Sequence, residues 1–159
     1  MKLCVVTSEY PHGSRYHGGI GTTMRDLARG FTAHGHEVHV VTRADRNEPE
    51  STWDDDGVDV HTVHPMLIRL RGFWRIEHLA PVAISRLRYS IAVSRKLRAL
   101  ARQKKFDSVI SAEWGAETFW FALLHKKAPL LVSISGPTFI MGRYAGTLRG
   151  LDGVLTEWM

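Results

Sequence analysis

Short runs of apolar residues alternate with amphipathic helical patterns along this chain, and this alternation constrains its fold most strongly. Residues 2–8 include four consecutive apolar residues, and residues 37–42 include three valines. Between these runs, apolar residues recur at helical spacing from Ile20 to Phe31. Strands that alternate with helices pair in parallel. We therefore predict an α/β fold: a Rossmann-like, doubly wound, mainly parallel sheet flanked by helices.

The rest of the chain continues the pattern. We expect further strands at residues 58–64, 108–111 and 130–135, and helices from Pro81 to about Arg102 and over residues 116–126. An acidic loop is expected over residues 47–57, and the alternating apolar residues of 58–64 fit an edge strand. Residues 153–156 are expected to begin one more strand. A doubly wound domain normally closes such a strand with a helix, so we expect one domain over residues 1–159, truncated near its end.

A glycine-rich loop follows the first expected strand. Gly18, Gly19 and Gly21 lie where the first helix begins, and Thr22 or Thr23 could cap that helix. Glycine lets backbone amides approach an anion closely, and a helix N-terminus carries a partial positive charge. Ligands of such sheets bind at the carboxyl ends of the strands, where this loop lies. The residues fit a phosphate site and equally fit a plain tight turn into the helix.

Two well-known phosphate motifs do not fit this loop. A dinucleotide fingerprint would need a third glycine at the position of Met24, and the second strand ends in Thr42 and Arg43 instead of a ribose-binding acid. A P-loop would need Gly-Lys-Ser or Gly-Lys-Thr, which the sequence lacks.

Several motifs together resemble the N-terminal, acceptor-side domain of family 4 glycosyltransferases, which have the two-domain GT-B fold. The resemblance extends over the whole chain in the expected order. It is carried by the strand and Tyr-Pro of residues 1–11, the glycines of 18–21, Gly-His-Glu-Val at 35–38, and the segments 57–60, 106–110 and 152–156.

The resemblance implies a role for the glycine loop. In that family a C-terminal domain holds most of the nucleotide sugar, and the glycine loop approaches its diphosphate from the other side of a cleft. Gly18, Gly19, Gly21 and Arg15 are then the donor-phosphate contacts. Transfer is expected to retain the anomeric configuration, with no divalent metal or other cofactor, because amides and basic groups stabilise the leaving diphosphate. The donor-binding domain is expected to be absent here, and residues 1–159 alone to be inactive.

The resemblance also implies acceptor contacts. They are Tyr16, His17, Glu113, Trp114, Ser135 and Gly136. Many family members have a His where Ser135 stands, so we assign no catalytic residue. By themselves, Glu113 and Trp114 also fit a helix-entry acid beside a packing aromatic, and Tyr16 and His17 fit an ordinary surface loop.

Positive charge is concentrated in one segment. From Met66 to Lys105 there are eleven Lys and Arg and one acid, Glu77, whereas the remainder has ten bases and fifteen acids. Basic and apolar residues from Arg69 to Arg102 suit an anionic membrane surface, and they also suit a solvated helix face. No pattern of a nucleic-acid reading helix occurs, so we expect no nucleic-acid partner.

Composition narrows the remaining choices. The single Cys4 excludes a disulfide framework and favours a cytoplasmic location, with a peripheral position at the inner membrane face as a second hypothesis. The nine His residues form no zinc motif, so no metal site is expected. A non-catalytic Rossmann-like module that binds a nucleotide or an anionic partner stays open as an alternative to a glycosyltransferase.

Overall fold

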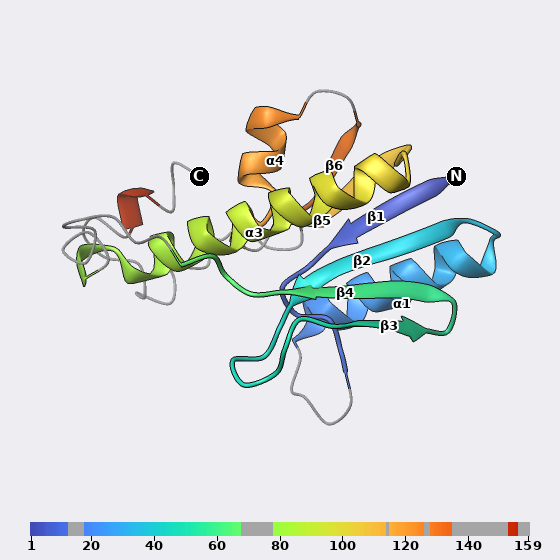
Figure 1. Cartoon of the computed structure of the whole chain (residues 1–159), viewed down its shortest axis with the longest axis horizontal. Coiled ribbons are helices and arrows are strands. Elements are labelled where there is room, and N and C mark those ends of the chain that lie inside the picture. The colour runs from blue at the N-terminus through green and yellow to red at the C-terminus, as the bar shows by residue number, and fades with distance from the viewer. Residues whose placement is uncertain (13–17, 68–77, 114, 126–127, 135–152, 156–159) are drawn as a thin grey trace.

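The computed structural model shows a six-stranded sheet with helices on both faces (Figure 1). It describes residues 1–159 apart from 13–17, 68–77, 114, 126–127, 135–152 and 156–159. The strands are β1 (Lys2–Val6), β2 (Glu37–Arg43), β3 (Thr52–Asp55), β4 (Val58–Val63), β5 (Ser108–Ala112) and β6 (Leu130–Ser133). The helices are α1 (Gly19–Ala33), α3 (Pro81–Gln103) and α4 (Phe119–Leu124).

The sheet has the order β3-β4-β2-β1-β5-β6, and every neighbouring pair except β3 with β4 is parallel. This arrangement confirms the predicted α/β, doubly wound fold. In the sheet, β2 and β4 lie on one side of β1, and β5, which comes later in the chain, lies on its other side. The order therefore reverses between β1 and β5, and the loops that follow these two strands open at the same point.

Both faces of the sheet are covered, which explains the runs of consecutive valines. Cys4, Val6 and Val41 pack in a cluster with residues of α3 and α4. Val5 and Val40 point the other way, into a second cluster with residues of α1. Successive side chains of a strand alternate between faces, so a strand buried on both sides is apolar at most positions on both faces.

We predicted a loop over the acidic stretch at residues 47–57. The structure contradicts this, because the stretch contains β3. This strand pairs antiparallel with β4 and takes the edge of the sheet, so β4 is not an edge strand. Asp56 and Gly57 connect the two strands with φ values of 54° and 85°. Asp-Gly at a two-residue turn is a strong hairpin signal, and the abundance of acids obscured it in the sequence.

Three further expectations about local structure were wrong. α1 begins at Gly19 with Gly18 as its N-cap and has no side-chain cap; the Thr22 hydroxyl instead donates back to the Gly18 carbonyl at 3.4 Å. α4 covers Phe119–Leu124 only. Residues 153–155 are helical, so the strand expected at 153–156 is not formed over them. Short apolar runs do not distinguish strand from helix by periodicity, which accounts for the last error.

Candidate functional site at the carboxyl ends of β1 and β5

The N-terminus of α1 is occupied by a carboxylate of the same chain. The Gly18 N–H donates to Glu9 Oε2 at 3.2 Å. A Cβ added to Gly18 would lie 2.6 Å from the same oxygen, so a larger residue here would require the flexible Glu9 side chain to move. A negative charge is favourable at this position, because the N–H groups of a helix N-terminus carry a partial positive charge. In this structure that charge is the Glu9 carboxylate.

The other two glycines of the loop differ from each other. A Cβ on Gly21 would lie 1.6 Å from the Glu9 carbonyl oxygen, because the backbone of the β1 loop runs directly over the helix there. A Cβ on Gly19 would meet nothing within 4 Å. The fold therefore requires glycine at position 21. Within the described residues, nothing requires it at position 19.

A polar network holds the β1 loop in place. The Tyr10 hydroxyl donates to Asp55 Oδ2 at 2.7 Å, and the Arg29 guanidinium donates to both carboxylate oxygens of Asp55, at 2.6 and 3.1 Å. The Tyr10 N–H donates to Thr42 Oγ1 at 3.2 Å. Burial, and then the hydrogen bond to Asp55, raise the pKa of Tyr10. The unexpected strand β3 supplies Asp55, so this strand helps to position the glycine loop.

The loop after β5 turns sharply inward. Gly115 and Ala116 both have positive φ, 84° and 54°, and this turn directs Glu117 toward the end of β1. Glu117 Oε1 accepts the Ser8 N–H at 2.6 Å. The two loops at the switch point are thus joined by one buried carboxyl group, whose residue is 2% exposed. Burial raises the pKa of Glu117 to about 8 and outweighs the opposing effect of the Ser8 hydrogen bond.

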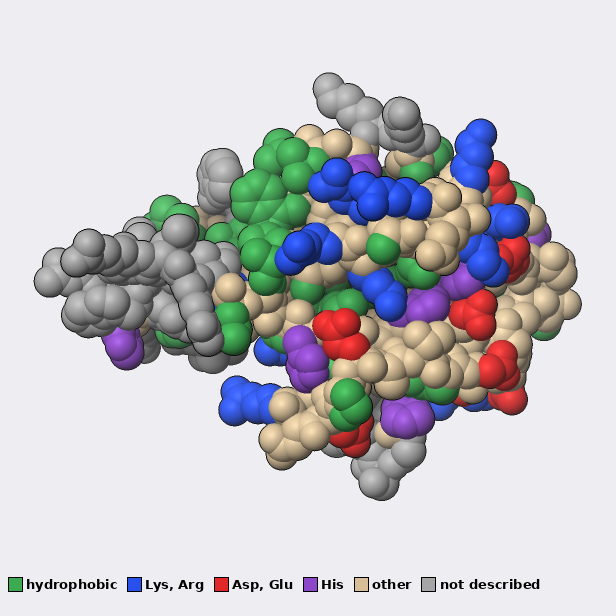
Figure 2. All heavy atoms as spheres, in the orientation of Figure 1, with side chains coloured by type: hydrophobic (Ala, Val, Ile, Leu, Met, Phe, Trp, Pro, Cys, Tyr) green, Lys and Arg blue, Asp and Glu red, His purple; other side chains and the backbone are tan. Residues whose placement is uncertain are grey.

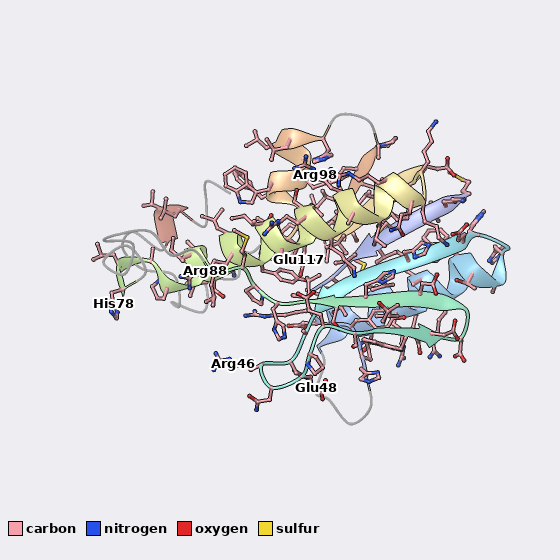
Figure 3. The ribbon with its side chains drawn as sticks, in the orientation of Figure 1. Arg46, Glu48, His78, Arg88, Arg98 and Glu117 are labelled. Carbon is pink, nitrogen blue, oxygen red and sulfur yellow. The ribbon has the colours of Figure 1, made fainter. Side chains whose placement is uncertain are left out.

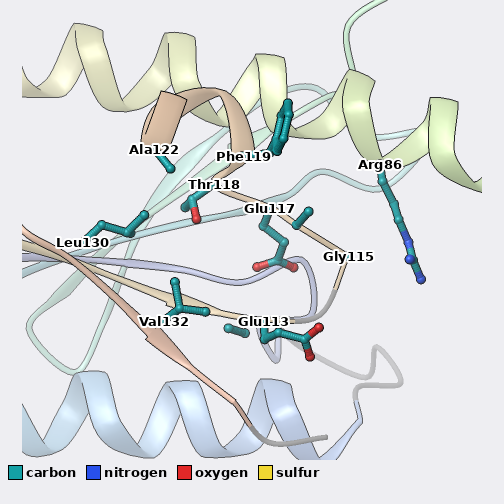
Figure 4. A pocket seen from close by; sticks show the side chains of 11 residues that line it. Arg86, Glu113, Gly115, Glu117, Thr118, Phe119, Ala122, Leu130 and Val132 are labelled. Atoms are coloured by element: carbon teal, nitrogen blue, oxygen red, sulfur yellow. The ribbon is translucent and has the colours of Figure 1, made fainter. Parts of the chain in front are cut away.

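Two cavities meet at this carboxyl group. One is about 210 Å³ in volume and is bounded by α4, β6 and the β5 loop, with Glu113 on its wall (Figure 4). The other is about 340 Å³ and lies between α3 and the ends of β1 and β2. Arg86, Gly115 and Glu117 line both. A third, more open hollow of about 760 Å³ lies next to the glycine loop, between Ser8, Glu9 and the β2 loop that contains Arg46 and Glu48 (Figure 3).

The structure describes four of the predicted site residues. Gly18, Gly19 and Gly21 lie at the start of α1, and Glu113 lies on the wall of the 210 Å³ cavity, at the same end of the sheet. The others lie outside the described residues: Arg15, Tyr16, His17, Trp114, Ser135 and Gly136.

The sequence analysis did not identify Glu117, and it read Arg86 only as one of the basic residues of a helix face. A helix expected from Ala116 would have made Glu117 an ordinary exposed acid of its first turn. The contact with Ser8 spans 109 residues of sequence, so no local pattern reveals it. The one available signal was Gly115 immediately before that expected helix, because a glycine there allows the chain to turn.

The histidines that are close in sequence are separated in space. His34 is exposed and His36 is half-buried, whereas His39 is buried in β2 and lies 3.2 Å from His61 of β4, between Nδ1 and Nε2. Among the described residues, no group of three or more His, Cys, Asp or Glu could hold a metal ion. The part of the chain that the structure describes also has no helix long and apolar enough to cross a membrane.

Comparisons with known proteins place the chain in a family. The sequence model of the glycosyl transferase 4-like domain matches residues 18–158. Sucrose-phosphate synthase from Thermosynechococcus elongatus has a similar structure, with a TM-score of 0.64 at 13% sequence identity, over 98% of this chain and 39% of that one. This chain therefore spans well under half the length of that enzyme. No curated protein matches it. Because the family model covers most of the sequence, this protein belongs to the glycosyl transferase 4-like domain family and is a glycosyltransferase module.

Proposed function

We propose that this domain is the acceptor-side half of a retaining, metal-independent glycosyltransferase that needs no other cofactor. The enzyme transfers a sugar from a nucleotide-sugar donor to a carbohydrate or lipid-linked acceptor. One observation carries the proposal: an anion-attracting helix end and two cavities with polar groups open at the same switch point. A second, donor-binding domain outside these residues completes the enzyme, as the resemblance to two-domain glycosyltransferases implies.

On the donor side, Gly19 is the position that fits a close approach by a diphosphate. The first intrahelical hydrogen bond of α1 is made by the Thr22 N–H to Gly18, so the amides of Gly19, Ile20 and Gly21 precede it. A Cβ at position 19 would meet no described residue within 4 Å, and we propose that the diphosphate lies there. A diphosphate at this helix end competes with the Glu9 carboxylate, so donor binding is coupled to the position of Glu9.

On the acceptor side, the cavities offer both polar and apolar walls. The 210 Å³ cavity is lined by Glu113 and by the apolar side chains of Phe119, Leu130 and Val132. Sugars present hydroxyl groups at their edges and C–H groups on their faces, so a mixed wall of this kind suits them. Residues Tyr16, His17, Trp114, Ser135 and Gly136 remain proposed acceptor contacts on the basis of the family resemblance.

The experiment that tests the proposal uses the longer protein with its donor-binding domain. UDP-, GDP- and ADP-sugars are supplied with carbohydrate and lipid-linked acceptors, and release of nucleoside diphosphate is measured with and without EDTA. We expect release with one nucleotide class, undiminished by EDTA, and no transfer by residues 1–159 alone. Nucleotide binding without release for any donor would favour the non-catalytic module. Transfer by residues 1–159 alone would refute the proposed division into donor and acceptor domains.

A membrane surface is a second proposed partner. Lys and Arg side chains gather over α3 in Figure 2, and among them Arg95, Arg98 and Arg102 are exposed. Exposed Leu79 lies just before this helix, at 64%. We propose a cytoplasmic enzyme that associates peripherally with anionic lipid, because basic and apolar groups together favour such an interface. Vesicles containing phosphatidylserine should sediment the longer protein at low salt, and replacing the three arginines by serine should abolish this. Equal sedimentation with neutral vesicles would contradict the electrostatic basis.

A further inference from the structure

Glu117 carries a polar atom that its surroundings do not satisfy. Its Oε1 accepts the Ser8 N–H at 2.6 Å, but its Oε2 is buried and has no hydrogen-bond partner among the described residues. The residue is 2% exposed. Leaving a buried polar atom without a partner is costly, and native proteins rarely do so without a reason.

The residue that carries the unsatisfied oxygen lines two cavities. Glu117 lines both, together with Arg86 and Gly115. In Figure 4 its side chain lies between α3 and the strand ends, with Glu113 below it and Arg86 to its right. The cavities, of about 210 and 340 Å³, are several times the roughly 30 Å³ that one water occupies in the liquid. The site therefore has room for more than a single bridging water.

The surroundings of Glu117 favour its neutral form. Burial raises the pKa of the carboxyl to about 8, and the negative charge of Glu9 raises it further. The groups on the walls around it are Glu9 beyond Ser8, Arg43 at the end of β2, Arg86 and Tyr89 on α3, and Glu113 on the β5 loop. Because Oε1 already accepts a short hydrogen bond, the proton at neutral pH resides on Oε2. This oxygen is then a donor without an acceptor.

We propose that Glu117 Oε2 anchors a neutral, hydroxylated ligand by donating a hydrogen bond to one of its oxygen atoms, in the two cavities at the carboxyl ends of β1 and β5. This inference rests on the proposed function, for which such a ligand is the carbohydrate acceptor. Phe119, Leu130 and Val132 supply apolar walls on one side of the anchor, and Ser8 and Ser85 supply polar ones on the other. Glu117 thereby selects a ligand oxygen that can accept a hydrogen bond.

The test measures the carboxyl group directly, so it does not depend on enzymatic activity. The Glu117 side-chain carbon is followed by ¹³C NMR while the pH is varied, with and without the methyl glycosides of glucose, galactose and mannose. We expect a midpoint near 8 in the free protein. Binding of at least one glycoside should raise it, because a ligand that accepts from Oε2 stabilises the protonated form. The affinity for that glycoside should then fall up to tenfold per pH unit above the midpoint.

Two substitutions separate this proposal from its alternatives. Glu117→Gln keeps an acceptor for Ser8 and a donor toward the cavity, so it should bind the same glycoside with an affinity that no longer depends on pH. Glu117→Met keeps the volume but removes the donor, and should weaken binding at least tenfold. Circular dichroism checks that both variants fold; if Glu117→Met does not, the titration of the parent protein still decides.

Three results would overturn the proposal. A midpoint near 4.5 would remove the proton from Oε2. Loss of binding in Glu117→Gln would mean that the carboxylate acts as an acceptor. A midpoint near 8 that no glycoside moves would leave water as the partner of Oε2. None of these results bears on whether the longer protein releases nucleoside diphosphate, so failure here and failure of the proposed function are distinguishable.

Discussion

Replacing Gly21 by Ala should damage the fold, whereas the same replacement at Gly19 should not. The two glycines lie two residues apart in the first turn of α1. At Gly21 the new methyl group would lie 1.6 Å from the Glu9 carbonyl oxygen and 2.8 Å from its carbonyl carbon. At Gly19 it would meet nothing within 4 Å. The pair therefore tests the geometry of the loop with one chemical change at two sites.

The magnitude follows from what must move. To reach even 3.0 Å, the Gly21 Cβ and the Glu9 oxygen must part by about 1.4 Å, and both belong to backbone segments that cannot rotate away. Overpacking typically costs about 1–3 kcal/mol and occasionally more; because backbone must move this far, we place the cost here at about 3–5 kcal/mol, of which alanine recovers about 1 kcal/mol in helix propensity. We expect Gly21→Ala to lower the free energy of unfolding by about 2–4 kcal/mol. Gly19→Ala should raise it by about 0.5 kcal/mol.

Urea unfolding followed by far-UV circular dichroism measures both variants. The expected loss for Gly21→Ala corresponds to a decrease of roughly 5–15 °C in Tm for a domain of this size. If the two variants unfold at the same urea concentration, the close contact between Glu9 and α1 is not a feature of the protein and the reasoning fails. A stable Gly19→Ala variant of the longer enzyme that loses donor affinity would locate the diphosphate beside position 19.

Three other predictions concern charged and titratable groups. Asp55→Asn should lower the free energy of unfolding in urea by about 1–2 kcal/mol, because it removes an acceptor of Arg29. Asp56→Asn, at a more exposed ion pair with the same arginine, should lower it by at most about 0.5 kcal/mol. Equal losses in the two variants would contradict this. Burial lowers the pKa of His61 to about 4, so stability should decrease by about 1–2 kcal/mol, after allowing for solvent screening, as the pH falls from 6.5 toward 4. His61→Gln should remove that dependence on pH, and an unchanged slope would disprove the assignment. Glu117 should give the opposite dependence of stability on pH. Because its pKa is raised in the folded protein, stability is lost as the pH rises from 4.5 through 8. Glu117→Gln should therefore be more stable than the parent by about 2–4 kcal/mol at pH 9 relative to pH 5, and parallel stability curves would refute this.

The sequence predicts most of the fold because the strands of a doubly wound sheet are buried on both faces. β1 contains four consecutive apolar residues and β2 contains three valines, and few structures other than such buried strands need runs of this kind. β3 escaped prediction because an edge strand needs little hydrophobicity, and its pattern of Thr52, Trp53, Asp54 and Asp55 resembles a polar loop. Only the Asp-Gly turn that follows distinguished it.

The candidate site was predictable only in part, because its parts come together through long-range contacts. Glycines at a helix start are visible in the sequence, and so is an acid after β5. The sequence does not show that Gly18 pairs with the Glu9 side chain, or that Gly21 packs against the Glu9 backbone. Both contacts depend on how the β1 loop folds back over α1. The burial of Glu117 depends equally on α3 and β1, which are distant in sequence from the β5 loop.

Two energetically unfavourable features of this fold, a strained backbone residue and a buried carboxyl group, lie together at the switch point. Ala116 has a positive φ that non-glycine residues seldom adopt, and it serves to direct Glu117 inward. Glu117 is then buried with one oxygen unsatisfied. If its only role were to join the two loops, a residue that merely accepts the Ser8 N–H without an ionisable group would do so at lower cost at neutral pH. A ligand oxygen on Oε2 removes the penalty in the bound state alone, so the same arrangement that weakens the free domain strengthens the complex.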